Sequence, residues 1–308
     1  MKRLLVTGAS GLLGLNLALA ACDQGYTVTG VVHDHRLIGT PFEVRTCDLA
    51  QPGEISWLVK EAHPDVIVHC AAVANLEAAE AAPRLAQRLN TDLPGQLAAA
   101  AAAHSIRFVH ISTYAVFDVA RGGYSEEDTP NPLSVYWRTK LAGEQAVAAA
   151  YPGALIARVN FYGWSLSGQR SLAEWFFNNL TSRQAVNGFT DVYFCSLLVN
   201  DLAALLLKMI SRGLSGIYHV VNRECISKYT FGVVLARQFG LDESLISPVS
   251  VHNSGLVARR SPNLTLRTGK LTRLLGDVLP DQTECLQRFY QLYQQGYPAR
   301  IKAYAEES

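Results

Sequence analysis

The chain has 308 residues, of which 49% are hydrophobic and 17% are charged, and its formal net charge is +1. This length suits an enzyme with a sizeable buried core, built as one large α/β unit or as two closely joined lobes. Because positive and negative charges nearly cancel, we expect neither nucleic acid nor an anionic membrane as a general partner. The opening apolar run is too short for a signal sequence, and no run approaches the roughly 18 apolar residues that span a bilayer, so we expect a cytoplasmic protein.

Six cysteines are scattered along the chain without a Cys-x-x-Cys pair. This pattern predicts neither a zinc site nor a disulfide framework. We therefore expect no bound metal and six buried thiols in a reducing compartment: Cys22, Cys47, Cys70, Cys195, Cys225 and Cys285.

Short apolar or β-branched runs alternate with longer helical patterns through the first two thirds of the chain. Such alternation is typical of repeated βαβ units, and nearly continuous apolar runs indicate strands that are covered by helices on both faces. We therefore predict an α/β fold built on a doubly wound parallel sheet. The predicted strands cover residues 3–7, 27–32, 43–46, 65–70, 107–112, 154–159 and 217–221, and the predicted helices cover 12–24, 54–62, 83–104, 134–150 and 200–212.

The alternation becomes irregular after Trp164. We predict a first domain over residues 1–164, which carries the sheet, and a smaller lobe mainly over residues 165–308, which closes over a substrate. The strand and helix near residues 196–221 are expected to return to the first domain, so the lobe consists of two pieces.

A glycine-rich turn, Thr-Gly-Ala-Ser-Gly-Leu-Leu-Gly over residues 7–14, joins the first predicted strand to the first predicted helix. Gly8 permits a tight turn, Gly11 lets the backbone approach a pyrophosphate, and Gly14 lets the helix pack closely on the strand. This spacing is a weak signal alone, but its place between a strand and a helix favours a dinucleotide site. The expected cofactor contacts in this turn are Gly8, Ser10, Gly11, Leu12, Leu13 and Gly14.

The end of the second predicted strand bears on the choice of cofactor. It reads Val-Val-His-Asp-His-Arg over residues 31–36. In dinucleotide-binding folds an acidic residue at this place holds the ribose diol of NAD. Here His33 and Arg36 provide groups for a 2′-phosphate, which favours NADP, whereas Asp34 keeps NAD as the alternative.

Two further strand ends supply candidate cofactor contacts. Asp48, after the third strand, is suited either to accept a hydrogen bond from the adenine amino group or to cap the next helix, and Leu49 follows it. After the fourth strand, the small side chains of Ala71 and Ala72 let a cofactor lie against the backbone. Asn90, inside a predicted helix, is expected to tie neighbouring strands rather than to bind a ligand.

Tyr136 and Lys140 are four residues apart and share one face of a predicted helix. A nearby ammonium lowers the pKa of a tyrosine hydroxyl toward a range useful for proton transfer, and Lys140 is also placed to hold the cofactor ribose. The pair alone is a common surface pattern. Thr113 strengthens the interpretation because it follows the fifth strand, at the edge where open α/β sheets bind ligands. We therefore predict Thr113, Tyr136 and Lys140 as the catalytic residues.

With these motifs in this order, the sequence resembles the extended short-chain dehydrogenase/reductase family, whose marks are Thr-Gly-x-x-Gly-x-x-Gly, a strand-end Ser/Thr and Tyr-x-x-x-Lys. Within that family it is similar to the dTDP-4-dehydrorhamnose reductases and to the regulatory β subunit of methionine adenosyltransferase. Residues 111–118, 124–130, 158–163 and 261–266 carry the similarity, which covers most of the chain. The resemblance implies a Rossmann domain, reduction of a keto group on a nucleotide-activated sugar with NADP or NAD as cofactor, and a homodimer, which is also the ordinary expectation from symmetry.

The chain departs from those reductases at Tyr114, where they usually carry an aspartate, and this departure leaves the sugar open. Tyr114 and Ala115 also argue against a nucleotide-sugar dehydratase, which has an Asp-Glu pair there. Two alternatives stay open, namely an epimerase that keeps NAD bound through each turnover and a non-catalytic, cofactor-sensing regulatory subunit. The expected substrate contacts are Ala74, Asn75, Thr113 and Asn160, with Arg259 and Arg260 as candidates for the substrate diphosphate.

Overall fold

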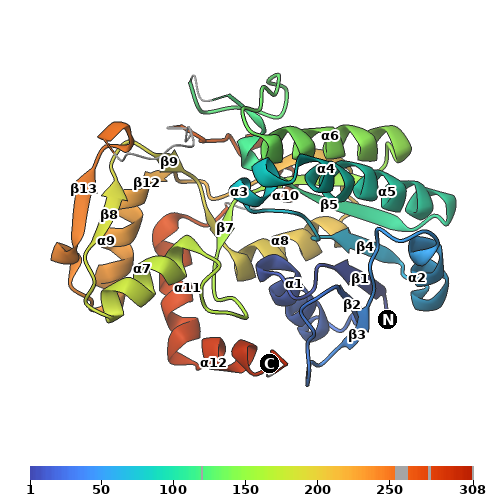
Figure 1. The fold of residues 1–308 in the computed structure, drawn as a ribbon, viewed down its shortest axis with the longest axis horizontal. Coiled ribbons are helices and arrows are strands. Elements are labelled where there is room, and N and C mark those ends of the chain that lie inside the picture. The colour runs from blue at the N-terminus through green and yellow to red at the C-terminus, as the bar shows by residue number, and fades with distance from the viewer. Residues whose placement is uncertain (119–120, 254–262, 277–278, 307–308) are drawn as a thin grey trace.

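The computed structural model describes residues 1–118, 121–253, 263–276 and 279–306, and in this part the chain builds a seven-stranded parallel sheet (Figure 1). The strand order is β11-β6-β5-β4-β1-β2-β3. This order reverses direction between β1 and β4, the point where doubly wound sheets bind ligands. The strands are β1 (Arg3–Thr7), β2 (Thr27–Val32), β3 (Glu43–Thr46), β4 (Val66–His69), β5 (Arg107–Thr113), β6 (Leu155–Val159) and β11 (Gly216–Val220).

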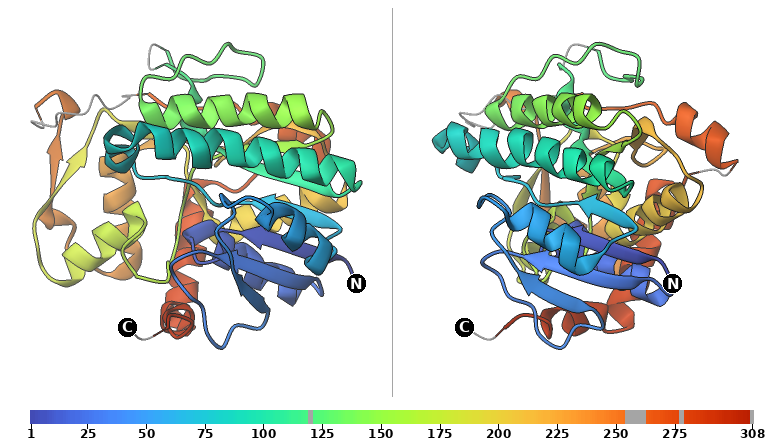
Figure 2. Two further views of the ribbon diagram at one scale, coloured as in Figure 1. Left: turned by 45° about the vertical axis from the view of Figure 1, so that its right-hand side comes forward. Right: turned by 90° about the vertical axis from the view of Figure 1, so that its right-hand side faces the viewer.

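Helices cover both faces of this sheet (Figure 2). α1 (Leu12–Asp23) and α8 (Val199–Ser211) pack together on one face, and α2 (Glu54–Ala62), α5 (Leu93–Ala103) and α6 (Val135–Ala150) lie on the other. Alternate residues of β1 point into the two layers, with Leu4 and Val6 in one core and Leu5 in the other. Burial on both faces explains the continuous apolar runs. The predicted doubly wound sheet is confirmed.

The helix predicted over residues 83–104 is interrupted. It consists of α4 (Pro83–Gln87), a π-helical turn at Arg88–Asp92, and α5. In the π turn, the buried Asn90 side chain accepts a hydrogen bond from the backbone N of Val73 and donates to Val73 O and to Thr139 Oγ1. Asn90 therefore ties the loop after β4 to helix α6, not two strands to each other as predicted. Such π turns are frequent at functional sites.

Beyond Trp164 the chain forms smaller elements beside the sheet (Figure 1). α7 (Leu172–Thr181) packs on α9 (Lys228–Phe239), and β8 (Val186–Phe189) pairs in parallel with β13 (Ile246–Val249). Between these pieces the chain returns to the sheet, where β11 pairs with β6. The domain limits at residues 164 and 165 stay a prediction. The other elements are β7 (Phe161–Tyr162), β9 (Tyr193–Phe194), β10 (Leu197–Leu198), β12 (Ile226–Ser227), α3 (Leu76–Ala81), α10 (Gly269–Leu275), α11 (Gln282–Gln294) and α12 (Tyr297–Lys302).

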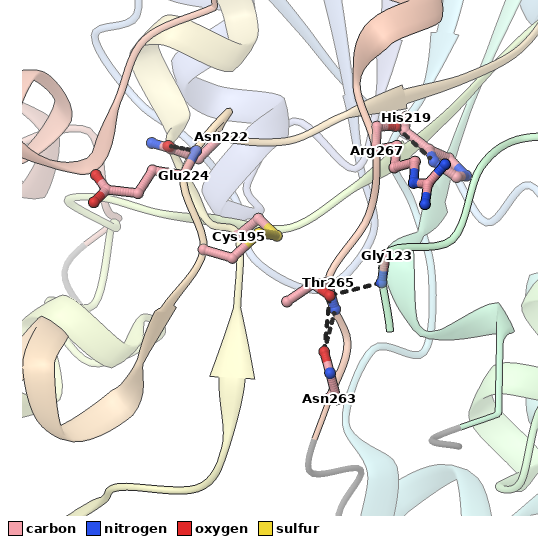
Figure 3. The surroundings of a disulfide bond; sticks show 9 residues. Gly123, Cys195, His219, Asn222, Glu224, Asn263, Thr265 and Arg267 are labelled. Carbon is pink, nitrogen blue, oxygen red and sulfur yellow. Dashed lines mark hydrogen bonds between the residues drawn. A yellow bond between two sulfur atoms is a disulfide. The ribbon is translucent and has the colours of Figure 1, made fainter. Parts of the chain in front are cut away.

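Cys195 and Cys225 form a disulfide bond, so the expectation of six thiols is wrong for this pair (Figure 3). β9 and β12 are antiparallel neighbours with Phe194 opposite Ile226, and this register places Cys195 opposite Cys225, with their Cα atoms 4.2 Å apart. Because 30 residues separate the two in sequence, only the tertiary pairing of the strands brings them within bonding range. The four free thiols are Cys22, Cys47, Cys70 and Cys285.

Candidate active site

The glycine turn between β1 and α1 leaves no room for a side chain at Gly8 or Gly14. Gly8 has a φ of +68°, and a Cβ at this position would be 2.7 Å from the backbone N of Ala71, just after β4. A Cβ on Gly14 would be 2.1 Å from the carbonyl O of Gly8. Gly11 closes the turn by donating its backbone N–H to Gly8 O at 2.9 Å. The turn therefore requires glycine at positions 8 and 14.

The N-terminus of α1 fits a phosphate group. No described side chain caps Gly11, and the first turn of α1 contains no acidic residue. The first backbone N–H groups of α1 and the positive end of its dipole are therefore suited to an anion. Ser10, Gly11 and Leu12 are partly exposed, whereas the Leu13 side chain packs into the core, so Leu13 meets a ligand through its backbone alone. These residues fit the pyrophosphate of a dinucleotide.

The groups predicted to select the cofactor lie just past the end of β2. His33, Asp34 and Arg36 are exposed. His33 Nδ1 lies 2.9 Å from Asp34 Oδ1. Asp34, the residue that could hold the ribose diol of NAD, is therefore already in contact with a histidine. An exposed arginine beside such a pair is suited to a 2′-phosphate, because guanidinium binds phosphate oxygens strongly.

The predicted capping role of Asp48 is wrong, because the N-cap of α2 is Gly53 and no described side chain caps it; the adenine contact stays a prediction. Asp48 Oδ1 accepts a hydrogen bond from Ala50 N at 3.0 Å, and its Oδ2 accepts one from Gln51 Nε2 at 2.9 Å. These hydrogen bonds hold the pKa of the Asp48 carboxyl below its ordinary value. Asp48 thus stabilises the turn before α2, and the side chain of Leu49 is buried in the core beneath it. Of the other predicted cofactor contacts, Ala71 is partly buried against Gly8 and Ala72 is exposed.

Tyr136 and Thr113 meet at the C-terminal end of β5. Thr113 is the last residue of β5, and its side chain lies close enough to the Tyr136 hydroxyl to lower the pKa of that group. Ser134 caps α6 by accepting a hydrogen bond from Trp137 N at 3.2 Å, which sets where the helix begins and hence where Tyr136 lies. The two hydroxyls therefore converge on one place, as two groups that bind one substrate oxygen must.

Lys140 is almost completely buried, one helical turn after Tyr136. Its Nζ donates a hydrogen bond to the carbonyl O of Ile111 at 2.7 Å. Burial lowers the pKa of Lys140 to about 8, although Glu144 and Cys70 act in the opposite direction. Burial raises the pKa of Tyr136 to about 12, and the nearby Thr113 side chain only partly offsets this. The expected lowering of the tyrosine pKa by Lys140 is therefore wrong for this structure, because the ammonium binds a backbone carbonyl instead.

A buried ion pair behind the predicted catalytic residues was not predicted from the sequence. Arg158 Nη2 lies 2.8 Å from Glu144 Oε2, and each side chain is only 2% exposed. Glu144 also accepts a hydrogen bond from the hydroxyl of Ser112, the residue before Thr113. The pair thus joins α6, β5 and β6 directly behind the site. Its signal in the sequence is Arg158 itself, a charged residue inside an otherwise apolar strand.

Two histidines on neighbouring strands lie under the site. The rings of His69 on β4 and His110 on β5 stack with centroids 5.7 Å apart, and His69 Nδ1 lies 2.7 Å from the hydroxyl of Thr7. Burial lowers the pKa of His69 to about 3 and that of His110 well below its ordinary value. Both rings are therefore neutral at pH 7 and add no positive charge beside Lys140.

The predicted substrate contacts differ in their exposure and in their hydrogen bonds. Ala74 and Asn75 are exposed, and Asn75 caps α3 by accepting a hydrogen bond from Ala78 N at 2.9 Å. Asn160 follows β6, and its amide Nδ2 is buried without a hydrogen-bond partner among the described residues. Because burying an unpaired amide costs free energy, Asn160 is the polar group of this set that most needs a ligand. Arg259 and Arg260 lie outside the described residues.

The described residues supply hydroxyl and ammonium groups at the ligand edge of the sheet. They contain no group of three or more His, Cys, Asp or Glu side chains that could hold a metal ion. Among the same residues, no helix has the length and apolar character needed to cross a membrane. The arrangement is suited to donate a proton to an oxygen next to a bound dinucleotide.

The chain is similar to known proteins over most of its length. A family model described as the RmlD substrate binding domain matches residues 1–295. A probable low-salt glycan biosynthesis reductase of Haloferax volcanii is 32% identical over 246 residues, which are 78% of this chain and 81% of that protein. A dTDP-4-dehydrorhamnose reductase of Mycobacterium tuberculosis is 30% identical over 259 residues, covering 81% of this chain and 79% of that protein.

Two further matches extend the comparison. The methionine adenosyltransferase 2 subunit beta of Mus musculus is 30% identical over 290 residues, which are 92% of this chain and 85% of that protein. The crystal structure of a dTDP-4-dehydrorhamnose reductase from Bacillus anthracis, in complex with NADP, superposes with a TM-score of 0.84 at 26% identity, covering 94% of this chain and 99% of that one.

Proposed function

The chain belongs to the RmlD substrate binding domain family, and we propose that it uses NADPH to reduce a keto group on a nucleotide-activated sugar. The observation that carries this proposal is the meeting of the Tyr136 and Thr113 side chains at the C-terminal end of β5. The pair lies on the ligand edge of the sheet, where the glycine turn also lies. Relatives that are named as reductases, and a similar structure that contains NADP, support the same reaction and cofactor.

The chain has a group for each charged part of NADPH. The N-terminus of α1 would hold the pyrophosphate, His33 and Arg36 would bind the 2′-phosphate, and Lys140 would donate a hydrogen bond to a ribose hydroxyl. When bound, NADPH supplies the hydride that converts the substrate carbonyl carbon to an alcohol.

Tyr136 would then act as the proton donor. A hydroxyl with a pKa of about 12 is protonated at pH 7, so it can donate a hydrogen bond to the carbonyl oxygen and give up its proton as negative charge develops there. Thr113 would donate a second hydrogen bond to the same oxygen, in a place prepared before the reaction begins. Glu144, bound to Arg158 on β6 and to Ser112 on β5, would fix the position of α6 on the sheet. The hydroxyls of Tyr136 and Thr113 would therefore stay in place.

Asn160 supports a polar substrate on the side of β6. Its unpaired amide would donate to a sugar or phosphate oxygen. Tyr114, at the position of the reductases' usual aspartate, lies in the short 3-10 turn Tyr114–Val116 directly after Thr113. Because this side chain is close to the proton-donating pair, we propose that it helps to select the sugar.

A turnover assay tests the proposal. NADPH and NADH would be supplied in parallel to a panel of nucleotide 4-keto sugars that includes dTDP-4-dehydrorhamnose, and oxidation of the cofactor would be followed. In Tyr136→Phe we expect turnover to fall by about 10²- to 10⁴-fold, with unchanged NADPH affinity, because only the proton donor is lost. Tyr290→Phe on α11 is the matched control. Near-normal turnover in Tyr136→Phe would contradict the mechanism.

A regulatory role is the second candidate, and the match to methionine adenosyltransferase 2 subunit beta over 92% of the chain favours it. Co-purification with a methionine adenosyltransferase, together with no turnover on any keto sugar, would support this role. Tightly bound, oxidised NAD in the purified protein would instead indicate an epimerase. A homodimer and a cytoplasmic location stay predictions, which light scattering and cell fractionation would test.

A further inference from the structure

The Cys195–Cys225 disulfide fastens a very short pair of strands. β9 and β12 contribute only two residues each, and their register places the two cysteines at the end of this ladder. So short a ladder has few hydrogen bonds of its own, and isolated two-stranded pairs are marginally stable in water. The disulfide is therefore a large part of what holds β9 to β12.

β9 also supports the segment formed by residues 263–267. Leu264 N donates a hydrogen bond to Tyr193 O on β9 at 3.3 Å. On its other side the segment pairs with residues 123 and 124, because Thr265 Oγ1 accepts a hydrogen bond from Gly123 N at 2.7 Å. Figure 3 shows the disulfide, Thr265 and Gly123 in one small region. The segment is thus held between β9 and the loop that leads to α6.

From this segment, packing contacts reach the proton donor. Leu264 is buried in one cluster with Ala115 and Trp137, and the rings of Tyr114 and Tyr136 pack against this cluster. Cys195 belongs to the adjoining cluster, which contains the side chains of Val116 and Phe117 and is also in contact with Tyr114. The disulfide therefore lies behind the turn that follows Thr113 and, through β9 and Leu264, behind Tyr136.

We propose that Cys195 and Cys225 are a reversible thiol–disulfide site whose oxidation state sets the order of the substrate side of the active site. Disulfides in reducing compartments are usually transient and redox-sensing, and a partly exposed disulfide is open to exchange. Cys225 is partly exposed, whereas Cys195 is 1% exposed. Cys225 is therefore the more accessible of the two to an incoming thiolate.

The exchange reaction balances with a dithiol as the reductant. One thiolate of the dithiol attacks Cys225 Sγ, the Sγ–Sγ bond breaks, and Cys195 leaves as a thiolate that takes up a proton. The second thiol of the reductant then displaces Cys225, so two electrons pass to the protein and the reductant becomes a cyclic disulfide. Glutathione disulfide reverses the change: Cys225 thiolate attacks one of its sulfurs, the glutathione S–S bond breaks, and one glutathione thiolate leaves as the mixed disulfide forms. Cys195 thiolate then attacks Cys225 Sγ and releases the second glutathione thiolate.

The test compares the full chain after equilibration with dithiothreitol and with glutathione disulfide. Alkylation and mass spectrometry would report the state of the two cysteines, and hydrogen exchange would report local order. In the dithiothreitol-treated protein we expect faster exchange over residues 121–126 and 263–267 and unchanged exchange over residues 8–14. We also expect kcat/KM for the keto sugar to fall by about tenfold, since small displacements of reacting groups are costly. NADPH affinity is expected to stay the same, because the glycine turn lies outside the disulfide's contacts.

Variants separate the disulfide from general effects of thiol reagents. Cys225→Ser should behave like the reduced protein in either buffer, whereas Cys22→Ser, which removes a free thiol, should respond as the parent does. Full alkylation of Cys195 and Cys225 after glutathione disulfide treatment would overturn the proposal, as would identical exchange in the two states. The activity readout rests on the proposed function, but the exchange readout does not. No turnover in either state, with the exchange difference intact, would therefore contradict the proposed function alone.

Discussion

The side chains of Tyr136 and Thr113 face each other between the first turn of α6 and the last residue of β5, close enough for Thr113 to lower the pKa of the Tyr136 hydroxyl. This arrangement places the proposed proton donor and a second hydroxyl together on the ligand edge of the sheet.

The hydroxyl of Thr113 is expected to contribute to turnover beyond its part in the fold. Thr113→Val removes the hydroxyl but keeps the branched shape, and we expect kcat to fall by about tenfold or more, because one hydrogen bond to the reacting oxygen is lost. Thr113→Ser keeps the hydroxyl and is the matched control. Steady-state kinetics on the keto sugar would measure both, and equal activity in the two variants would remove Thr113 from the mechanism.

Arg36 is expected to select NADPH over NADH. In Arg36→Ala we expect NADPH affinity to fall by about tenfold, equivalent to one charge-assisted hydrogen bond, and NADH affinity to change little. Arg237→Ala removes an exposed arginine from α9 and should leave both affinities unchanged. Fluorescence titration with each cofactor measures the ratio. The same loss for both cofactors would show that Arg36 does not bind a 2′-phosphate.

Breaking the buried Glu144–Arg158 pair is expected to destabilise the fold strongly. Glu144→Gln leaves a buried arginine without its counter-charge, and we expect the free energy of unfolding to fall by about 3–5 kcal/mol. Glu43→Gln breaks the exposed Arg45–Glu43 pair, which should cost less than about 1 kcal/mol. Urea denaturation measures both changes. Similar small losses in the two variants would mean that the buried pair is not needed to hold α6 and β5.

His69 is expected to make the protein less stable in acid. Burial lowers the pKa of His69 from 6.5 to about 3. Below pH 6.5 His69 is therefore protonated in the unfolded chain, whereas it stays neutral in the folded chain down to about pH 3. The free energy of unfolding should therefore fall as pH drops from 6.5 to about 3, and this contribution should be constant above 6.5.

Replacing His69 removes its contribution to the difference in bound protons between the unfolded and the folded chain. In His69→Gln we expect the dependence of the unfolding free energy on pH to be weaker by up to about 1.4 kcal/mol per pH unit in this window. His104→Gln, which replaces an exposed histidine, is the control. Urea denaturation at a series of pH values compares the slopes. The same slope in His69→Gln and the parent would show that His69 does not contribute.

Local features of the sequence were sufficient to predict the sheet and the glycine turn. Strands buried on both faces must be apolar throughout, and such runs are visible without any knowledge of neighbours. The turn has no room for a Cβ at Gly8 or Gly14. These positions must therefore be glycine, and their spacing can be recognised in the sequence. The order of Thr113, Tyr136 and Lys140 along the chain also indicated the type of chemistry before any contact was known.

Tertiary structure decided what these side chains touch. Lys140 faces the carbonyl of Ile111, Glu144 faces Arg158, and Cys195 faces Cys225, and in each case the partner lies on a different element. Burial, which sets the pKa of Tyr136 at about 12, likewise depends on packing from Leu264 and other distant residues. The sheet and the glycine turn follow from local sequence pattern, because strand burial and the need for glycine act residue by residue. The raised pKa of Tyr136 and the Cys195–Cys225 disulfide follow only from the fold, because both depend on residues brought together by packing.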